Sequence, residues 1–443
     1  MNGTDDSSLF GRGLSRRTVL VGGLGAGATM LLAACGGVTG TSTKKGSNGN
    51  GTGTINALFM QQAGYSTTDV AQMVKAFEAK NPKIKVKTTF VTYDALHDKI
   101  VTAAAAHTYD VVLIDVIWPA EFATKNIVAD VTDRYPASWQ QTMLGGALGT
   151  AKYQDKYYGV PWGLDTKFFY YNKKMLSQAG VDPSTLGTWD GVLTAARALK
   201  SKGVVKYPLA WSWDQAEAIM CDYTQLVGAW GGSFVDSSGN LTLNQGGAVK
   251  ALEWMRGTIE SGLTNPASTT FAEADVEKTL NNAQAAFGLN WTYYFASSNT
   301  RANSKVVGDI VVQQTPKGPA GKQPGVNGAM AVSISSGSQN QDAAWKFIEF
   351  ITSEPELDKY AAQALPIWKA SYQKQSVVHS APETFAAAAK QLNDLIVRPP
   401  VANYTAISQI IQVELQNALL GKKSAQSALD DAVSKAKPLL KSS

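Results

Sequence analysis

Two aspartates and one arginine occupy positions where a charged side chain needs a partner. Asp115 lies near the end of the apolar segment DVVLIDV, where a carboxylate lowers stability unless it accepts hydrogen bonds. Asp165 follows VPWGL, and Arg398 precedes two prolines that fix the local backbone. Such groups can bind ligand hydroxyls. The structural alternatives are a protein donor for Asp115, a helix cap for Asp165 and a surface salt bridge for Arg398.

Tryptophan is frequent, with 11 residues in the chain, and several stand at expected strand ends or in loops. An indole face suits the apolar C–H face of a sugar ring, although tryptophans also fill cores and groove walls. The aromatic candidates for ligand contact are Trp118, Trp162, Trp211, Trp213 and Trp291. The polar candidates beside them are Gln62, Asn290 and Asn327.

Motifs of the common enzyme classes are absent from the sequence: it has no HExxH, GxxxxGK[ST], GxSxG or Cys-x-x-Cys. Its three histidines are scattered and give no metal-ligand spacing. A glycosidase would need two carboxylates roughly 5 to 10 Å apart, a role open to Asp115 and Asp165. Their aromatic surroundings suit sugar binding without catalysis. We therefore expect a binding protein with no metal and no cofactor, and a secreted hydrolase is the enzyme alternative.

The charge and cysteine content exclude other classes. The formal net charge is +5 for the whole chain, and removing the first 34 residues leaves 37 basic and 33 acidic residues, or +4. A nucleic-acid-binding protein would cluster its basic residues on one face, so no nucleic-acid partner is expected. The chain has two cysteines, and we expect Cys221 to be a small buried hydrophobic residue.

The N-terminal segment SRRTVLVGGLGAGATMLLAACGG has the order of an export signal. Its 17 uncharged residues from Thr18 to Ala34 are fewer than the roughly 20 that cross a bilayer, and four glycines disfavour a helix. A basic start, a short apolar stretch and small residues instead indicate a signal peptide over residues 1–34. It resembles a twin-arginine signal joined to a lipoprotein cleavage box, which implies lipid on Cys35. Sec export is the alternative, because Val19 and Val21 replace residues usual in twin-arginine signals.

The linker and the first elements follow. Residues 35–53 comprise Cys35 and a linker, Gly36 to Gly53, which is rich in Gly, Ser, Thr and Asn and is predicted to be a flexible tether. Strand-like TINALFM, IKVKTTFV and DVVLIDV then alternate with helical patterns, so the order is β-α-β-α-β. Such units form a parallel sheet whose ligands bind beyond the carboxyl ends of the strands.

A second set of elements begins near Tyr157. The pattern predicts a helix over Trp189–Lys202, and it predicts that Asp214 and Glu217 cap a later helix. We expect an α/β protein of two lobes with central mixed sheets. Lobe 1 comprises residues 54–163 and 292–337, and lobe 2 comprises residues 164–291 and 338–443. Crossings between the lobes are expected near Gly163–Asp165, near Trp291 and near Ser336–Asn340.

Four segments resemble one family, the extracellular solute-binding proteins of ATP-driven sugar importers, in the branch of maltose- and trehalose-type binding lipoproteins. They are DVVLIDVIWPAEFA, YYGVPWGLDTKFFYYNKKML, AAFGLNWTYYFAS and VRPPVANY. The resemblance implies a periplasmic-binding-protein fold with a hinge, and sugar contacts from Asp115, Trp118, Asp165, Asn290, Trp291 and Arg398. One departure is Val326-Asn327-Gly328-Ala329, where many relatives have Gly-Gly and a large residue, so a sugar contact there is missing or made by Asn327.

The resemblance also implies a function. The chain would be the membrane-tethered component of an ABC importer, which binds a disaccharide or small oligosaccharide between its lobes and docks on the permease. The alternatives are another solute, such as a polyol, a glycerophosphodiester or a peptide, and the secreted hydrolase already named.

Overall fold

The computed structural model of the protein describes residues 52–61 and 64–440. The predicted signal peptide, Cys35 and Gln62 lie outside the described residues, as does most of the predicted linker. Among the helices of the described ranges, none is both long enough and apolar enough to cross a membrane.

The first sheet contains the predicted N-terminal strands. Its members are β1 (Gly53–Met60), β2 (Ile84–Val91), β3 (Val111–Asp115), β6 (Val160–Gly163) and β12 (Met330–Ile334). The order is β2-β1-β3-β12-β6, with β1 parallel to β2 and β3, and β12 antiparallel to β3 and β6. Helices α1 (Thr67–Lys80) and α2 (Tyr93–Ala104) connect the first three strands, which confirms the predicted β-α-β-α-β unit.

The second sheet is built from the middle of the chain. Its members are β7 (Phe168–Asn172), β8 (Leu209–Ala210), β9 (Phe287–Asn290) and β10 (Ile310–Gln313). The order is β10-β7-β9-β8, with β7 antiparallel to both neighbours and β8 parallel to β9. Two small pairs complete the strands: β4 (Lys152–Tyr153) with β5 (Lys156–Tyr157), and β11 (Gly325–Val326) with β13 (Leu395–Ile396).

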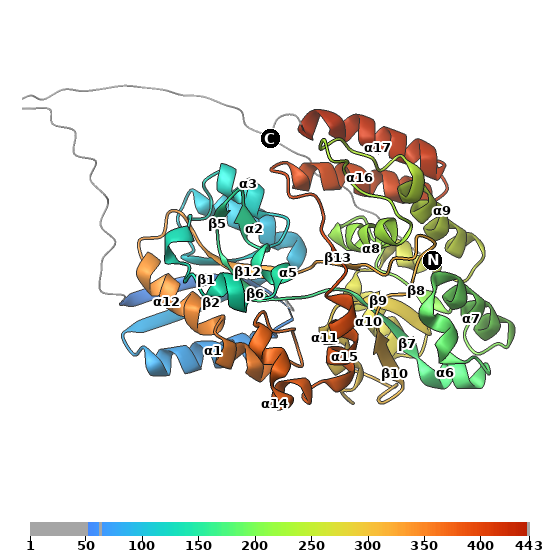
Figure 1. Ribbon diagram of the computed structural model, residues 1–443, viewed down its shortest axis with the longest axis horizontal. Helices are drawn as coiled ribbons and strands as arrows, with labels where there is room; N and C mark the ends of the chain where they lie inside the picture. The colour runs from blue at the N-terminus through green and yellow to red at the C-terminus, as the bar shows by residue number, and fades with distance from the viewer. Residues whose placement is uncertain (1–51, 62–63, 441–443) are drawn as a thin grey trace, which may run out of the picture. The chain divides into compact units, whose positions relative to one another are not determined.

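Helices cover both sheets (Figure 1). Besides α1 and α2, they are α3 (Pro119–Thr124), α4 (Trp139–Thr142), α5 (Gly145–Leu148), α6 (Lys173–Gln178), α7 (Trp189–Ser201), α8 (Glu217–Ala229), α9 (Gly246–Glu260), α10 (Glu273–Asn281), α11 (Tyr293–Ser298), α12 (Gln341–Ile351), α13 (Glu354–Leu357), α14 (Gln375–Val378), α15 (Pro382–Gln391), α16 (Tyr404–Leu419) and α17 (Ala425–Leu440). Short 3-10 helices span Thr132–Arg134, Pro183–Gly187, Pro266–Thr270, Asp358–Tyr360 and Lys369–Gln373.

The two sheets define two halves of the described body, and the predicted two-lobed α/β class is confirmed. We call the first sheet with α1, α2, α3, α5, α12 and α13 the first half. The second sheet with α6 to α11, α15, α16 and α17 is the second half. Figure 1 places the blue and cyan strands of the first half apart from the green and yellow elements of the second.

The predicted lobe boundaries are wrong at two places. β10 pairs with β7 in the second sheet, although residues 292–337 were expected in lobe 1. α12 packs on α1, β1 and β12, although residues 338–443 were expected in lobe 2. The amphipathic face of α12 buries Phe347, Ile348 and Ile351 against the first sheet, and periodicity alone does not say which sheet receives such a face.

The segments that cross between the two halves also differ from the predicted ones. The chain passes between sheets from β6 to β7, as predicted near Gly163–Asp165, and again between β10 and β12. The chain does not cross between the halves near Trp291, because β9 and β10 belong to the same sheet. The segment Ser336–Asn340 joins β12 to α12 within the first half, so it is not a crossing either. A further crossing lies between α13 and α15, which packs on β10. Three of the crossing segments lie side by side, through single bridges from Leu164 to Leu365 and from Thr166 to Asn327.

Candidate functional site

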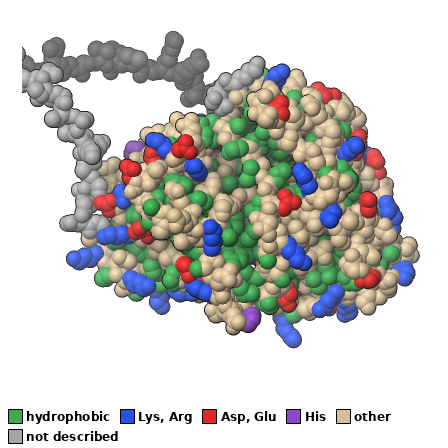
Figure 2. All heavy atoms as spheres, viewed as in Figure 1, with side chains coloured by type: hydrophobic (Ala, Val, Ile, Leu, Met, Phe, Trp, Pro, Cys, Tyr) green, Lys and Arg blue, Asp and Glu red, His purple; other side chains and the backbone are tan. Residues whose placement is uncertain are grey.

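A cavity of about 230 Å³ lies between the halves and takes side chains from both. Five of the predicted site residues line it: Asp115, Trp162, Asp165, Trp291 and Arg398. Six lining side chains used below were not predicted as ligand contacts: Tyr93, Asp94, Asp214, Glu217, Cys221 and Glu273. On the face drawn in Figure 2, hydrophobic side chains gather along the middle of the body, between the halves.

Asp115 reaches the cavity because it ends β3, the fully buried middle strand of the first sheet. Its Oδ2 accepts a hydrogen bond from the Tyr93 hydroxyl over 2.7 Å, and its Oδ1 accepts from Nη2 of Arg398 over 3.2 Å. The carboxylate is 5 % exposed, so these donors offset the loss of hydration. Both sequence interpretations of Asp115 are therefore open, since it lines the cavity and also has protein donors.

Arg398 joins the two halves. Its Nη1 donates to Glu217 Oε1 over 2.8 Å, while Nη2 reaches Asp115 in the first half. Glu217 also accepts from the hydroxyls of Tyr404 (2.5 Å) and Ser408 (2.6 Å). Although burial lowers the pKa of Arg398, the neighbouring charges raise it well above its ordinary value. Arg398 is 3 % exposed, which excludes the alternative of a surface salt bridge.

The predicted cap of α8 is wrong. The N-cap position is Ala216, whose methyl group cannot accept a hydrogen bond from a backbone amide. Asp214 makes no cap hydrogen bond. Glu217 instead stands in the first turn of α8, where the helix dipole favours an acidic group. Its oxygens accept hydrogen bonds from Arg398, Tyr404 and Ser408, which are distant in sequence.

Asp165 lies on the first crossing, after β6. Its Oδ1 accepts from the amides of Thr166 (2.8 Å) and Thr292 (3.1 Å) and from the Thr292 hydroxyl. Burial raises the pKa of Asp165 to about 6, against the opposing effect of these three donors. Thr292 directly precedes α11, so Asp165 ties the crossing to the start of that helix while lining the cavity.

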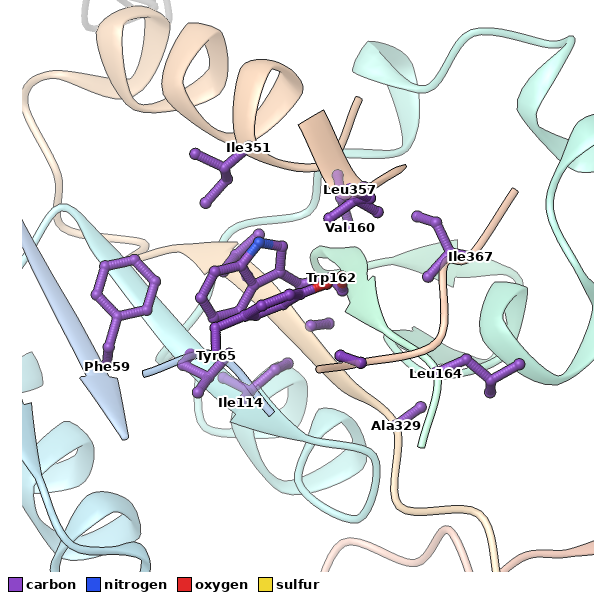
Figure 3. Packing of buried hydrophobic residues seen from close by; sticks show 14 of the residues in the cluster. Phe59, Tyr65, Ile114, Val160, Trp162, Leu164, Ala329, Ile351, Leu357 and Ile367 are labelled. Atoms are coloured by element: carbon purple, nitrogen blue, oxygen red, sulfur yellow. Dashed lines mark hydrogen bonds between the residues drawn. The ribbon is translucent and has the colours of Figure 1, made fainter. Parts of the chain in front are cut away.

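Trp162 and Trp291 bring aromatic surface to the cavity from opposite halves. Trp162 is 2 % exposed and packs tilted on Tyr65, with ring centroids 4.5 Å apart, and on Phe59 at 5.2 Å (Figure 3). Trp291 is only half-buried, and its Nε1 donates to Glu273 Oε1 over 3.2 Å. The larger ring face available to a ligand is therefore that of Trp291.

Five other predicted contacts do not line the cavity. Trp118 is buried behind Tyr93, on which it stacks, and Trp211 and Trp213 stack on each other in the core of the second half. The side chain of Asn290 binds the amide of Trp291 and the carbonyl of Glu273. That of Asn327 binds the Gly146 carbonyl and the Ala329 amide. These side chains position the site or fill the core, and direct contact with a ligand in this cavity would need a rearrangement.

Acidic groups gather at the cavity beyond Glu217. Asp214 Oδ1 is buried and has no hydrogen-bond partner among the described residues. Burial, together with the charges of Glu273 and Asp94, raises the pKa of Asp214 to about 6. The sequence pattern assigned Asp214 to a helix cap, and nothing in the spacing around Asp94 indicated a ligand contact. The one available signal was WSWDQAE, an acidic group beside an aromatic pair after a short strand.

The positively charged side chain in the cavity wall is already paired with acidic groups of the protein. Arg398 is the single cationic side chain among the described lining residues, and two carboxylates bind its guanidinium. Six carboxylates line the same cavity: Asp94, Asp115, Asp165, Asp214, Glu217 and Glu273. In the described part of the chain, no group of three or more His, Cys, Asp or Glu side chains is arranged to hold a metal ion. The site thus offers hydrogen-bond acceptors and aromatic surface to a ligand that donates.

Comparisons with known proteins agree on one family. The family model described as bacterial extracellular solute-binding protein matches residues 63–357. A putative binding protein of Brucella abortus is 26 % identical over 373 residues, which cover 84 % of this chain and 89 % of that protein. A probable ABC transporter-binding protein of Deinococcus radiodurans is 27 % identical over 322 residues, or 69 % of this chain and 73 % of that one. The maltose-bound structure of MalE3 from T. maritima superposes with a TM-score of 0.81 at 27 % identity, covering 87 % of this chain and 99 % of that one.

Proposed function

Because the chain belongs to the family of bacterial extracellular solute-binding proteins, we propose that it binds a sugar, a disaccharide or small oligosaccharide, in the cavity between its halves. The family's members are the solute-binding components of ABC importers and not enzymes, and they act outside the cytoplasm. A permease of that class is therefore the partner. The sugar ligand and the lipid anchor in the membrane go beyond the family assignment and are our proposals.

One observation carries the sugar assignment: the half-buried ring of Trp291 lines a cavity that also presents carboxylates from both halves. An indole face packs on the apolar face of a pyranose, and carboxylate oxygens accept hydrogen bonds from its hydroxyls. The cavity of about 230 Å³ is far larger than the roughly 10 to 15 Å³ that a single water molecule needs, so it has room for an organic solute such as a sugar. The similar MalE3 protein holds maltose.

The same groups argue against an anionic solute. A phosphodiester needs cationic or amide donors, whereas the guanidinium of Arg398 is bound by Asp115 and Glu217. A phosphate beside six carboxylates would be repelled. Among the alternatives, the glycerophosphodiester is therefore disfavoured, and a polyol or a peptide is an outcome for the binding experiment to detect.

Ligand would act by favouring the closed arrangement of the halves. Asp115 belongs to the first half, and Glu217 and Trp291 belong to the second, so a sugar that contacts all three binds better when the halves are close. The side-by-side crossings at Leu164, Thr166, Asn327 and Leu365 are the segments where hinge bending would occur. The closed form would then be the one recognised by the permease.

Membrane tethering is proposed from the N-terminal sequence. Cleavage before Cys35 and lipid on its sulfur would place the body at the end of a flexible linker outside the cell membrane. Mass spectrometry of the exported protein tests this: a first residue Cys35 with added acyl mass supports it, and an unmodified or uncleaved N-terminus refutes it. Export that stops when Arg16 and Arg17 become lysines indicates the twin-arginine route, and unaffected export indicates Sec.

Thermal denaturation in the presence of candidate solutes tests the central proposal. Ligands that bind only the native state raise Tm in proportion to RT ln(1 + [L]/Kd). The panel should hold maltose, trehalose, glucose, ribitol, glycerophosphocholine and a tripeptide, with product analysis of the sugars. A rise in Tm with a sugar that is not cleaved supports the proposal. A rise confined to ribitol, the phosphodiester or the peptide, or hydrolysis of a disaccharide, contradicts it.

A further inference from the structure

Lys167 is a fully buried cation that no motif or spacing rule selects. It lies between β6 and β7, two residues after Asp165 on the first crossing, and is 0 % exposed. Its Nζ contacts Ser212 Oγ at 2.7 Å, Asp222 Oδ1 at 2.8 Å and Glu273 Oε1 at 3.0 Å. Although burial alone lowers the pKa of Lys167, the charges of Asp222 and Glu273 raise it, so the ammonium stays protonated.

This ammonium also lies against the aromatic surface of the proposed site. Nζ of Lys167 is 5.2 Å from the centroid of the Trp291 ring, within the range of a cation–π contact. Glu273 Oε1, which pairs with Lys167, is the same oxygen that accepts the hydrogen bond from Trp291 Nε1. The indole is therefore bound at its edge by Glu273 and on its face by Lys167.

We propose that Lys167 is a positioning residue for the ligand-stacking ring of Trp291. The inference rests on the proposed function in that the ligand stacked there is a sugar. Lys167 fixes the carboxylate that holds the indole N–H and contacts the ring face itself, so the free face of Trp291 is presented to the cavity before a ligand arrives. Prior ordering of this kind lowers the entropic cost of binding.

A purely structural ion cluster is the competing interpretation, and the chain offers a matched control. Asp222 pairs with the same ammonium from α8 but has no described contact with Trp291. Lys167→Met and Asp222→Asn both disrupt the buried pair. The proposal expects only the first to disturb the ring, whereas a structural cluster predicts parallel effects.

The first readout is the indole signal of Trp291 in the purified protein with ¹⁵N-labelled tryptophan, assigned by its loss in Trp291→Phe. In Lys167→Met, we expect the Trp291 N–H resonance to shift and broaden without ligand. The Trp213 indole, which neighbours Asp222, responds to either variant, while the indole signals away from Lys167 and Asp222 stay in place. Asp222→Asn should leave the Trp291 resonance near its wild-type position. An unmoved Trp291 resonance in Lys167→Met overturns the inference, and so does an equal displacement in both variants.

The second readout is the affinity for maltose, measured by calorimetry. Lys167→Met should bind on the order of tenfold more weakly than Asp222→Asn; equal affinities overturn the inference. If Lys167→Met does not fold, Glu273→Gln replaces it, because that change removes the charge that joins Lys167 to the indole but keeps an acceptor. If wild-type protein binds no sugar, the proposed function fails, and the ligand-free indole signal still decides the role of Lys167.

Discussion

Arg398 Nη2 donates to Asp115 Oδ1 over 3.2 Å, so two residues that were each expected to contact a ligand bind each other across 283 positions of sequence. The same guanidinium holds Glu217 in the second half at 2.8 Å. Arg398 is thus the bridge between a strand end of one half and a helix start of the other. A sugar at this point would join an existing network.

Arg398→Met should destabilise the protein strongly. It leaves Asp115 and Glu217 buried without their shared cation, and removing one partner of a buried pair costs about 3 to 5 kcal/mol of unfolding free energy. Urea denaturation of the two proteins measures the difference. The triple change Arg398→Met, Asp115→Asn and Glu217→Gln removes the unpaired charges and should recover part of the loss. A loss below about 1 kcal/mol in Arg398→Met would contradict a buried bridge.

Trp291 and Trp118 should respond differently to truncation. Trp291→Ala removes the half-buried ring that lines the cavity, so we expect on the order of tenfold weaker sugar binding or more. Trp118→Phe alters a ring that stacks behind Tyr93, outside the cavity wall, and should keep affinity near the wild-type value. Calorimetry with the best sugar of the thermal panel provides both values. A large loss in Trp118→Phe would restore the sequence prediction of direct contact.

Stability should change with pH through Asp214. Its pKa is about 6 in the folded protein and near 3.8 in the unfolded chain, so the folded state binds the proton more tightly. Stability from this group is therefore gained as pH falls from about 6 toward 4 and is absent above pH 7. Asp214→Asn should flatten that rise by about 1 to 2 kcal/mol, allowing for water at the cavity. Asp165 and Asp222, whose pKa values are also raised to about 6, leave a residual slope, and an unchanged profile in Asp214→Asn would exclude the assignment.

Cys221 provides a probe of cavity access. It is 3 % exposed, it lines the cavity, and burial raises the pKa of its thiol to about 12. In a chain carrying Cys35→Ser, it is the one remaining thiol. Reaction with dithiobisnitrobenzoate at pH 8 should be far slower than for free cysteine, and slower again with bound sugar. Cys221→Ser serves as the blank, and ligand-independent labelling at the rate of a free thiol would contradict the geometry.

Sequence patterns predicted what depends on local periodicity. The segment DVVLIDV is apolar almost throughout, which predicts a strand covered on both faces and places Asp115 at the correct sheet edge. The assignments of β10 and α12 failed because an amphipathic element carries no signal for which of two sheets it covers. Trp211 and Trp213 follow a short strand as Trp291 does, and only tertiary packing separates core rings from a cavity wall.

Sequence patterns also did not predict contacts between residues that are far apart in the chain. Glu217 has a sequence context that fits a helix cap, and its actual donors lie more than 180 positions away. Lys167 matches no motif or spacing rule, and its burial as a charged group depends on Asp222 and Glu273. Spacing rules do not detect residues whose roles come from such partners. Arg398 was found because two prolines follow it, and Asp165 because it follows VPWGL at an expected crossing between the lobes.

Gly328 supplies a test of how closely the Trp291 ring is confined. A Cβ at position 328 would overlap Cζ3 and Cη2 of Trp291, whereas one at Gly163, which also lines the cavity, would meet Ala364 at 3.5 Å, an ordinary contact. Gly328→Ala should therefore displace the ring and weaken sugar binding by roughly tenfold, since stacking needs the ring face in place. Gly163→Ala adds the same methyl group and should bind nearly as wild type. Calorimetry on both variants checks this, and equal affinities would mean that the ring is free to move without loss of binding.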